Sequence, residues 1–193
     1  MQNKKISLWL WTLLLALLIT VAAGCRPDEA VLPPDDDNNE ETPEERTMEF
    51  ALFFGEAEAI HSGKAGEYGF VAPVTRSAPA NEDPLAAALA ELIKGPRPED
   101  GDFFSTLPPT AKVLSAQLED RTARIDFSRE LISDSPGGTL GGTVFMQSLV
   151  FTLTQFPGIE KVLVLVEGEP WSDGHFIWEE PLGPADMAVC PGC

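Results

Sequence analysis

The segment VFTLTQFPGIEKVLVLVEG, residues 150–168, constrains the fold more than any other part of the chain. A helical pattern runs into Phe156, and Pro157-Gly158 ends it, because proline cannot continue a helix and glycine permits the reversal. Residues 161–167 then form a nearly unbroken β-branched and aliphatic run, which is typical of a strand covered on both faces. The segment therefore predicts a helix that turns sharply into a central strand.

The end of this helix has its own predicted contacts. Phe145, Leu149 and Leu153 fall on one side, whereas Gln147, Thr154 and Gln155 are expected to face outward. The hydroxyls of Thr152 and Thr154 are expected to bond back to the preceding helical turn. These contacts would fix the corner between the helix and the strand.

A second helix is predicted over residues 84–94. Asp83 is an N-cap candidate, Pro84 suits the first turn, and Gly95-Pro96 ends the helix. Leucines at the spacing of one helical face predict that this face is buried.

Strands account for most of the remaining pattern, and they are expected at 48–54, 67–76, 111–120, 122–128 and 175–181. The third and fourth form a hairpin across Glu119-Asp120-Arg121. The order ββα, ββα, ββ predicts an α+β fold with a single small sheet and two helices packed on one face. The domain should occupy residues 48–184, followed by a tail at 185–193.

Residues 1–24 have the features of a lipoprotein signal peptide. Lys4 and Lys5 precede an apolar run over 6–21, and VAAGC ends at Cys25. A membrane-spanning helix is the alternative, because the run approaches the length that crosses a bilayer. The small residues before the cysteine and the lack of a following positive cluster favour cleavage and lipidation of Cys25. Residues 25–47 are acidic and rich in proline, which predicts a disordered tether.

The tail ends in Cys190 and Cys193, in the sequence AVCPGC. A Cys-x-x-Cys pair can form a disulfide, remain a dithiol or supply half of a zinc site. No two further ligands are evident near it, so a disulfide or an idle dithiol is favoured, and no metal site is predicted.

Three segments, LAELIKGP at 89–96, the stretch 107–131 and TLTQFPG within 150–168, occur in an order that resembles the GerMN domain. This family of extracytoplasmic bacterial modules is associated with sporulation and spore germination. The resemblance implies a fold similar to ring-building motifs and no established catalytic residues or cofactors. Known relatives often carry two copies, whereas this chain has room for one.

Exposed aromatic residues are the remaining candidates for a site. Phe103 and Phe104 lie in a turn-rich loop, and Trp171 and Trp178 bracket the last predicted turn. Packing under the sheet is the favoured interpretation, and contact with a sugar or a protein groove is the alternative. No hydrolase or phosphate-binding motif is present, so an enzyme is not expected.

The formal net charge of −18 argues against nucleic acid as a partner, because phosphates would repel the chain. The sequence therefore predicts an extracytoplasmic module that acyl chains, such as palmitate, on Cys25 hold at the cell membrane. It would act as a structural or interaction protein with envelope or sporulation proteins. The alternative is a module that binds peptidoglycan or another carbohydrate.

Overall fold

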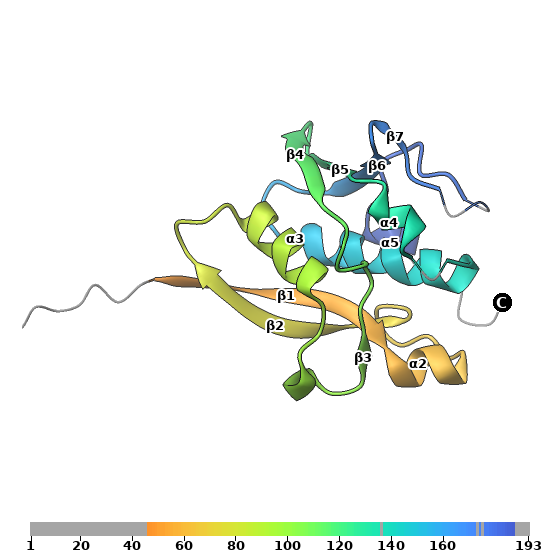
Figure 1. Ribbon diagram of the computed structural model, residues 1–193. Helices are drawn as coiled ribbons and strands as arrows, with labels where there is room; N and C mark the ends of the chain where they lie inside the picture. Colours follow the sequence, from red (N-terminus) through yellow and green to blue (C-terminus); the bar gives the residue numbers. More distant parts are fainter. Residues whose placement is uncertain (1–45, 136, 173, 175, 188–193) are drawn as a thin grey trace, which may run out of the picture. The chain divides into compact units, whose positions relative to one another are not determined.

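The described residues form two β-sheets, so the prediction of a single sheet is wrong (Figure 1). The computed structural model describes residues 46–187 except 136, 173 and 175. The predicted signal peptide, nearly all of the tether, and Cys25, Cys190 and Cys193 lie outside the described residues. The α+β class and the two main helices, α3 and α5, are confirmed.

The helices and strands alternate irregularly along the chain. Their order is β1 (Thr47–Glu56), α2 (Ala57–Ser62), β2 (Val71–Pro79), α3 (Pro84–Lys94), the 3-10 turn η1 (Pro98–Asp100), β3 (Phe103–Phe104), β4 (Val113–Glu119), β5 (Thr122–Phe127), α4 (Glu130–Ser133), α5 (Thr139–Leu153), β6 (Lys161–Val166), β7 (Glu169–Pro170) and η2 (Pro184–Met187).

The first sheet has the antiparallel order β2-β1-β3, with β1 in the middle. Alternation along β1 directs Phe50, Leu52 and Phe54 into the main core, and Phe53 into a smaller cluster on the other face. The long pairing with β2 contrasts with the short pairing to β3, which begins at Gly55. One edge of β1 is thus left without a neighbouring strand over most of its length.

The second sheet has the order β4-β5-β6-β7, and β5 and β6 run parallel. The predicted hairpin joins β4 to β5, and Asp120 and Arg121 have φ values of 45° and 65°, as a two-residue turn of type I′ requires. β6 lies between two strands, as predicted. In place of a strand at 175–181, β6 pairs with the two-residue β7, and an isolated bridge joins Ser172 to Ile177.

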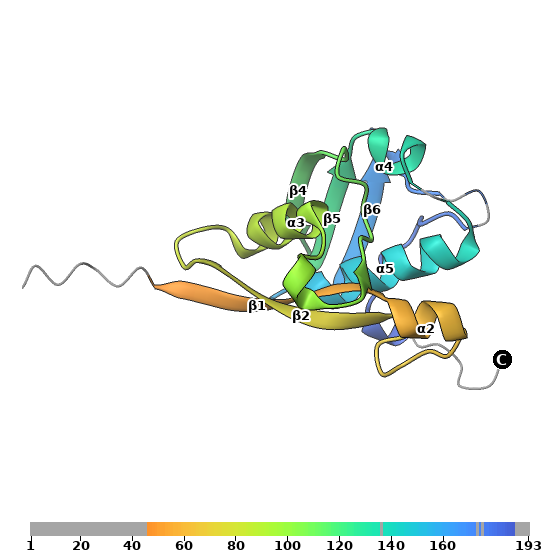
Figure 2. The same cartoon turned by 60° about the horizontal axis from the view of Figure 1, so that its bottom comes forward.

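Helix α5 packs against both sheets, which explains why it is apolar nearly all round (Figure 2). Leu149, Val150 and Leu153 are fully buried. Gln147 is also buried, so the expectation that it faces outward is wrong. Its side-chain oxygen accepts a hydrogen bond from Phe70 N at 2.9 Å. The prediction that both helices pack on one face of one sheet is corrected, because α5 is shared by two sheets.

Three polar side chains, two from α5 and one from the turn that follows it, occupy the place of a strand beside β1. Ser148 Oγ donates to Phe53 O at 2.6 Å, and Phe53 N donates to Thr152 Oγ1 at 3.0 Å. Gln155 Nε2 donates to Ala51 O at 2.6 Å, and its Oε1 accepts from Ala51 N at 2.8 Å. Ser148 and Thr152 lie one turn apart on one face of α5, and Gln155 follows in the turn after the helix ends at Leu153. They satisfy backbone groups that would otherwise need a neighbouring strand.

The corner after α5 matches its prediction in part. Thr154 Oγ1 donates back to Val150 O at 2.7 Å, as expected, whereas Thr152 bonds to β1 instead. Gly158 has a φ of 89°, a conformation that favours glycine. The corner therefore joins α5 both to β6 and to the first sheet.

Helix α3 forms as its sequence predicts. The Asp83 carboxylate accepts a hydrogen bond from Leu85 N at 2.9 Å, and Gly95 lies at the C-cap with a φ of 81°. Leu85, Leu89 and Leu92 are buried in the main core.

Candidate interaction groove

Two adjoining cavities lie where the segment 104–109, α4 and the start of α5 come together. The smaller has a volume of about 340 Å³ and the larger about 580 Å³. They share five lining residues, which are Thr106, Pro108, Ser135, Gly137 and Gly141. We call the two cavities together the groove.

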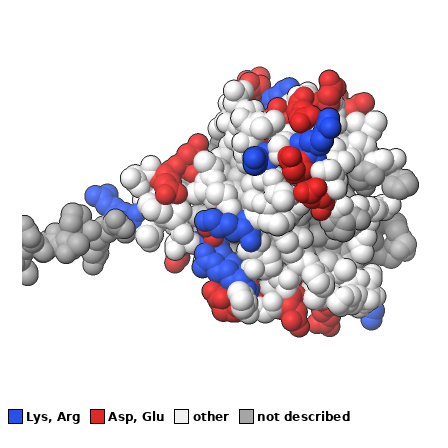
Figure 3. Space-filling model, viewed as in Figure 1, with Lys and Arg blue, Asp and Glu red and all other residues white. Residues whose placement is uncertain are grey.

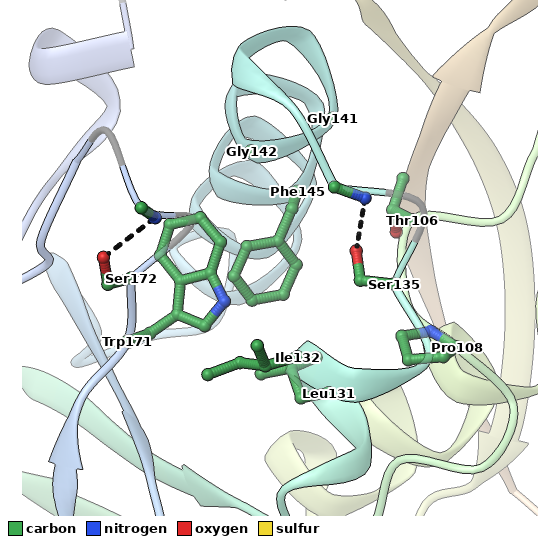
Figure 4. A pocket seen from close by; sticks show the side chains of 12 residues that line it. Thr106, Pro108, Leu131, Ile132, Ser135, Gly141, Gly142, Phe145, Trp171 and Ser172 are labelled. Carbon is green, nitrogen blue, oxygen red and sulfur yellow. Dashed lines mark hydrogen bonds between the residues drawn. The ribbon is translucent and has the colours of Figure 1, made fainter.

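Aromatic and aliphatic side chains form the smaller cavity (Figure 4). The rings of Phe145 and Trp171 lie with their centroids 4.8 Å apart, and Leu131 and Ile132 of α4 lie beside them. Ser172 accepts a hydrogen bond from Gly174 N at 3.1 Å. The cavity therefore presents an apolar wall with hydroxyl groups at its margin.

The larger cavity is lined mainly by apolar residues of α2, β3, the loop after β3 and α5: Ile60, Phe104, Leu107, Leu140 and Val144. At the margins of the groove, Phe104, Ile132 and Leu140 are 44%, 46% and 41% exposed. Gly55 of β1 lies beneath, because a Cβ there would approach Ile60 to 3.0 Å and Val144 to 3.2 Å. The absence of a side chain at this position lets the wall of the groove pack directly on β1.

Glycines form the side of the groove at the start of α5. Gly137 and Gly138 have φ values of 68° and 85°, which side chains other than glycine rarely adopt. Gly141 lies within α5, and a Cβ at this position would meet no atom within 4 Å. Among the described residues no side chain caps the N-terminus of α5 at Gly138, so its first-turn N–H groups lack a described side-chain acceptor. This side of the groove therefore exposes backbone rather than side chains.

A buried ion pair holds the segment that leads to Phe104. Arg76 of β2 and Asp100 of η1 form two hydrogen bonds, of which Arg76 Nη1 to Asp100 Oδ1 measures 3.0 Å. Arg97 N also donates to Asp100 at 2.5 Å. The guanidinium of Arg76 holds the pKa of Asp100 below its usual range. Asp100 is thus paired with a cation of the protein itself.

Glu91 of α3 extends this ionic network. Its carboxylate lies 2.6 Å from Lys94 Nζ, 3.0 Å from Arg97 Nη2 and 3.8 Å from Arg76 Nε. Burial acts to raise the pKa of Glu91, but the hydrogen bonds and charges of Lys94 and Arg97 outweigh it and lower the pKa. The network ties α3, β2 and η1 together, and so fixes the approach to β3.

Asp134 is the one titratable residue among the described residues that line the groove. Its carboxylate accepts hydrogen bonds from Thr110 Oγ1 at 2.6 Å and from Ser133 Oγ at 2.8 Å. These bonds lower the pKa of Asp134, which is therefore ionised at neutral pH. No cation pairs with it among the residues that the structure describes.

The chemistry of the groove is that of a binding surface. Acid–base catalysis needs a group that gives or takes a proton near the operating pH, and nucleophilic catalysis needs an activated nucleophile. The described lining residues include one ionised carboxylate and no histidine, cysteine or lysine. Over the described ranges, no three metal-ligating side chains gather to form a cation site.

The structure places the four predicted aromatic residues at different depths. Phe104 is exposed in the wall of the larger cavity, and Phe103 is half-buried beside it in β3. Trp171 lines the smaller cavity but is only 5% exposed, and Trp178 is fully buried against Phe145 and Trp171. Packing, the favoured interpretation for these side chains, describes Trp178.

Sequence reasoning missed the contribution of Leu131, Ile132 and Leu140 to the groove. The signal available was the glycine-rich segment 137–142, in which an exposed leucine has no obvious partner in sequence. The charged side chains, by contrast, form no large patch on the face in Figure 3, where acidic and basic groups are intermingled. Of the helices in the described part of the chain, none has the length and apolar character that crossing a bilayer requires.

Comparison with known families gives one match that spans most of the domain. The profile of the Germane family, described as sporulation and spore germination, matches residues 52–172. The spore germination protein GerM of Bacillus subtilis (strain 168) is 28% identical over 102 residues, which are 52% of this chain and 28% of that protein. The chain thus spans less than a third of the length of this relative.

Solved structures share the fold. The tandem GerMN domains of the sporulation protein GerM from Bacillus subtilis match with a TM-score of 0.52 and 23% identity, over 71% of this chain and 44% of theirs. The first GerMN domain of that protein matches with a TM-score of 0.50 and 26% identity, over 63% of this chain and 84% of its own. A protein from Clostridium perfringens, named as a candidate lipoprotein, matches with a TM-score of 0.50 and 23% identity, over 72% of this chain and 89% of its own.

Proposed function

Because the chain belongs to the Germane family of sporulation and spore germination domains, we propose that it is a lipid-anchored interaction module outside the cytoplasmic membrane. It acts there without catalysis, as a structural component of an envelope assembly linked to sporulation or spore germination. The single observation that carries this proposal is the family match over residues 52–172.

The groove supports an interaction role over a catalytic one. Its walls are apolar, and three large side chains at its margins are more than two-fifths exposed. Exposed apolar surface rimmed by polar groups is typical of sites that bind other molecules. The two shared hydroxyl residues, Thr106 and Ser135, can both accept hydrogen bonds at its centre, and Ser135 can also donate one, whereas the Thr106 hydroxyl donates to Ser148.

The membrane anchor rests on the sequence before Arg26. VAAGC ends at Cys25 after an apolar run, as lipoprotein signals do. A diacylated cysteine holds a protein stably on a bilayer, whereas one acyl chain binds reversibly. The candidate lipoprotein from Clostridium perfringens has the same fold, which is compatible with this location.

Mass spectrometry of the protein extracted in detergent tests the anchor. We expect a mature chain that begins at acylated Cys25, and we expect Cys25→Ser to migrate as the longer precursor. An unmodified Cys25, or Met1 retained on the mature species, would remove the anchor. Proximity labelling in sporulating cells tests the assembly, and labelling no different from that of an unrelated lipoprotein would contradict it.

A carbohydrate-binding module is the second candidate, and Trp171 in the smaller cavity is the observation that favours it. Aromatic rings stack against sugar faces, but a ring that is only 5% exposed offers little area for stacking. Pull-down on purified cell-wall sacculi separates the candidates. Binding that exceeds a lysozyme-treated control, and that falls in Trp171→Leu, would favour the carbohydrate.

A further inference from the structure

We propose that the groove binds an apolar segment of a partner protein that carries a lysine or arginine next to its apolar side chains. The inference deepens the proposed interaction role and rests on it. The binding surface is the groove between the segment 104–109, α4 and the start of α5, and the occupant is apolar with one basic residue.

The shape of the groove fits two side chains better than one flat contact. Two cavities of about 340 and 580 Å³ meet at the same five residues, so one segment can enter both. Their apolar ends differ, because Phe145 and Trp171 lie in one and Leu140 and Val144 in the other. Apolar anchors that enter pockets near the centre of an interface supply most of its binding energy.

Backbone exposure favours a polypeptide as the occupant. Gly141 presents no Cβ, and open space lies where a side chain would be. An extended segment can therefore approach the helix closely. The first-turn N–H groups of α5, which no side chain in the described ranges caps, can donate to carbonyl oxygens of such a segment. Main-chain hydrogen bonds with alternating side-chain pockets are a recurrent mode of peptide recognition.

The charge of the groove indicates that the occupant carries a basic residue. Among the described lining residues Asp134 supplies the one ionised group, and none of the cations that the structure describes pairs with it. The chain as a whole carries a formal net charge of −18, so its field also attracts cations and repels acidic segments. Both effects favour a basic residue beside the apolar anchors.

The test uses the full chain in lipid nanodiscs, with short fluorescein-labelled peptides as the probe. Each peptide carries two leucines and one lysine, and the panel separates the leucines by one, two or three residues. At least one peptide should bind saturably. The variant of that peptide in which serine replaces both leucines should bind about tenfold more weakly. Replacing its lysine by glutamate should weaken binding about fivefold at low salt, and Asp134→Asn should remove most of that difference.

Two variants of the protein localise the binding. Ile132→Ser and Gly141→Leu should each weaken the peptide about tenfold, the first by removing an anchor and the second by filling the groove. Gly141→Leu suits the test because its new side chain enters open space within a helix, and its melting temperature should not fall. Leu114→Ser is the matched control, since Leu114 is a 54% exposed residue of β4 outside the groove. It should bind within twofold of the parent.

Other results would overturn the proposal. No saturable binding of any peptide, or binding that Gly141→Leu leaves unchanged, would exclude this surface. Binding of soluble muropeptide fragments in place of the peptides would assign the groove to a glycan. Val31 and Leu32 are apolar residues of the predicted tether, and replacing both by serine would remove a competing occupant of the groove. Peptide binding that appears only in this double variant would assign the groove to the chain's own N-terminal segment. None of these results would affect the anchor or the labelling in cells, so failure here and failure of the proposed function are distinguishable.

Discussion

Replacing Thr152 by valine should destabilise the domain, because it removes the hydroxyl that accepts the buried Phe53 N–H at 3.0 Å. Thr152 is fully buried, so water cannot replace the lost acceptor. An unsatisfied buried donor costs about 1–3 kcal/mol, and the added methyl group of valine offsets about 0.8 kcal/mol. The net loss is about 0.2–2 kcal/mol. It lowers the melting temperature of a domain of this size by up to roughly 8 °C.

The matched control is Thr154→Val, two residues further along the same helix. The hydroxyl of Thr154 donates to Val150 O, which already accepts the backbone N–H of Thr154. Its loss should therefore cost less than about 0.5 kcal/mol. Urea denaturation compares the free energies of unfolding, and hydrogen exchange at the Phe53 amide should accelerate in Thr152→Val alone. Equal destabilisation by the two substitutions would refute the idea that α5 takes the place of a strand beside β1.

Three further predictions concern buried groups elsewhere in the domain. Arg76→Met should cost about 3 kcal/mol in urea denaturation by leaving the Asp100 carboxylate buried and unpaired, and adding Asp100→Asn should recover most of the loss; a double variant no better than the single one would contradict this. Hydrogen bonding to cations gives Asp100 and Glu91 lower pKa values in the folded than in the unfolded state, so their stabilisation is present above the unfolded pKa values and is lost as the pH falls through the folded ones. The free energy of unfolding should therefore decrease as the pH is lowered from 6 to 2. In Asp100→Asn this decrease should be smaller. Gly69→Ala should destabilise by about 2 kcal/mol or more, since φ is 76° and its Cβ would lie 2.1 Å from Gln147 Nε2; thermal unfolding within 2 °C of the parent would count against the packing.

Local signals were enough to predict much of the fold. Asp83 and Gly95 delimit α3 by capping, and Asp120-Arg121 forms the tight turn between β4 and β5. Pro157-Gly158 reverses the chain between the end of α5 at Leu153 and the start of β6 at Lys161. Each of these signals depends only on residues a few positions apart, so it can be recognised in the sequence without knowledge of the fold.

The division into two sheets depends on contacts between distant segments. Ser148, Thr152 and Gln155 bond to β1 about one hundred residues earlier in the chain, and no local pattern distinguishes such side chains from a solvated helix face. Gln147 was assigned to the surface for the same reason. Polar residues in a helix are ordinarily exposed. Gln147 is buried because its side-chain oxygen accepts a hydrogen bond from the backbone N–H of the distant Phe70.

The groove was predictable only in fragments. Phe104 and Trp171 stood out as large aromatic residues near turns, and the structure places them in adjoining cavities. Ile132 gave no signal and Leu140 only the glycine-rich segment around it, because apolar residues at the ends of helices are ordinarily core residues. Their exposure is consistent with the short connection between α4 and α5, in which no residue from 134 to 138 has a large apolar side chain that could cover them.

Site-specific photo-crosslinking in cells tests the central claim, an envelope module that acts by contact with a partner protein. A photoreactive phenylalanine analogue replaces Leu140 in the groove, or Leu114 on β4 as the control, in the full chain expressed during sporulation. The account predicts a discrete adduct between the Leu140 variant and an envelope protein, absent from the Leu114 variant and reduced by Gly141→Leu. No adduct at Leu140, or the same adducts at both positions, would contradict it.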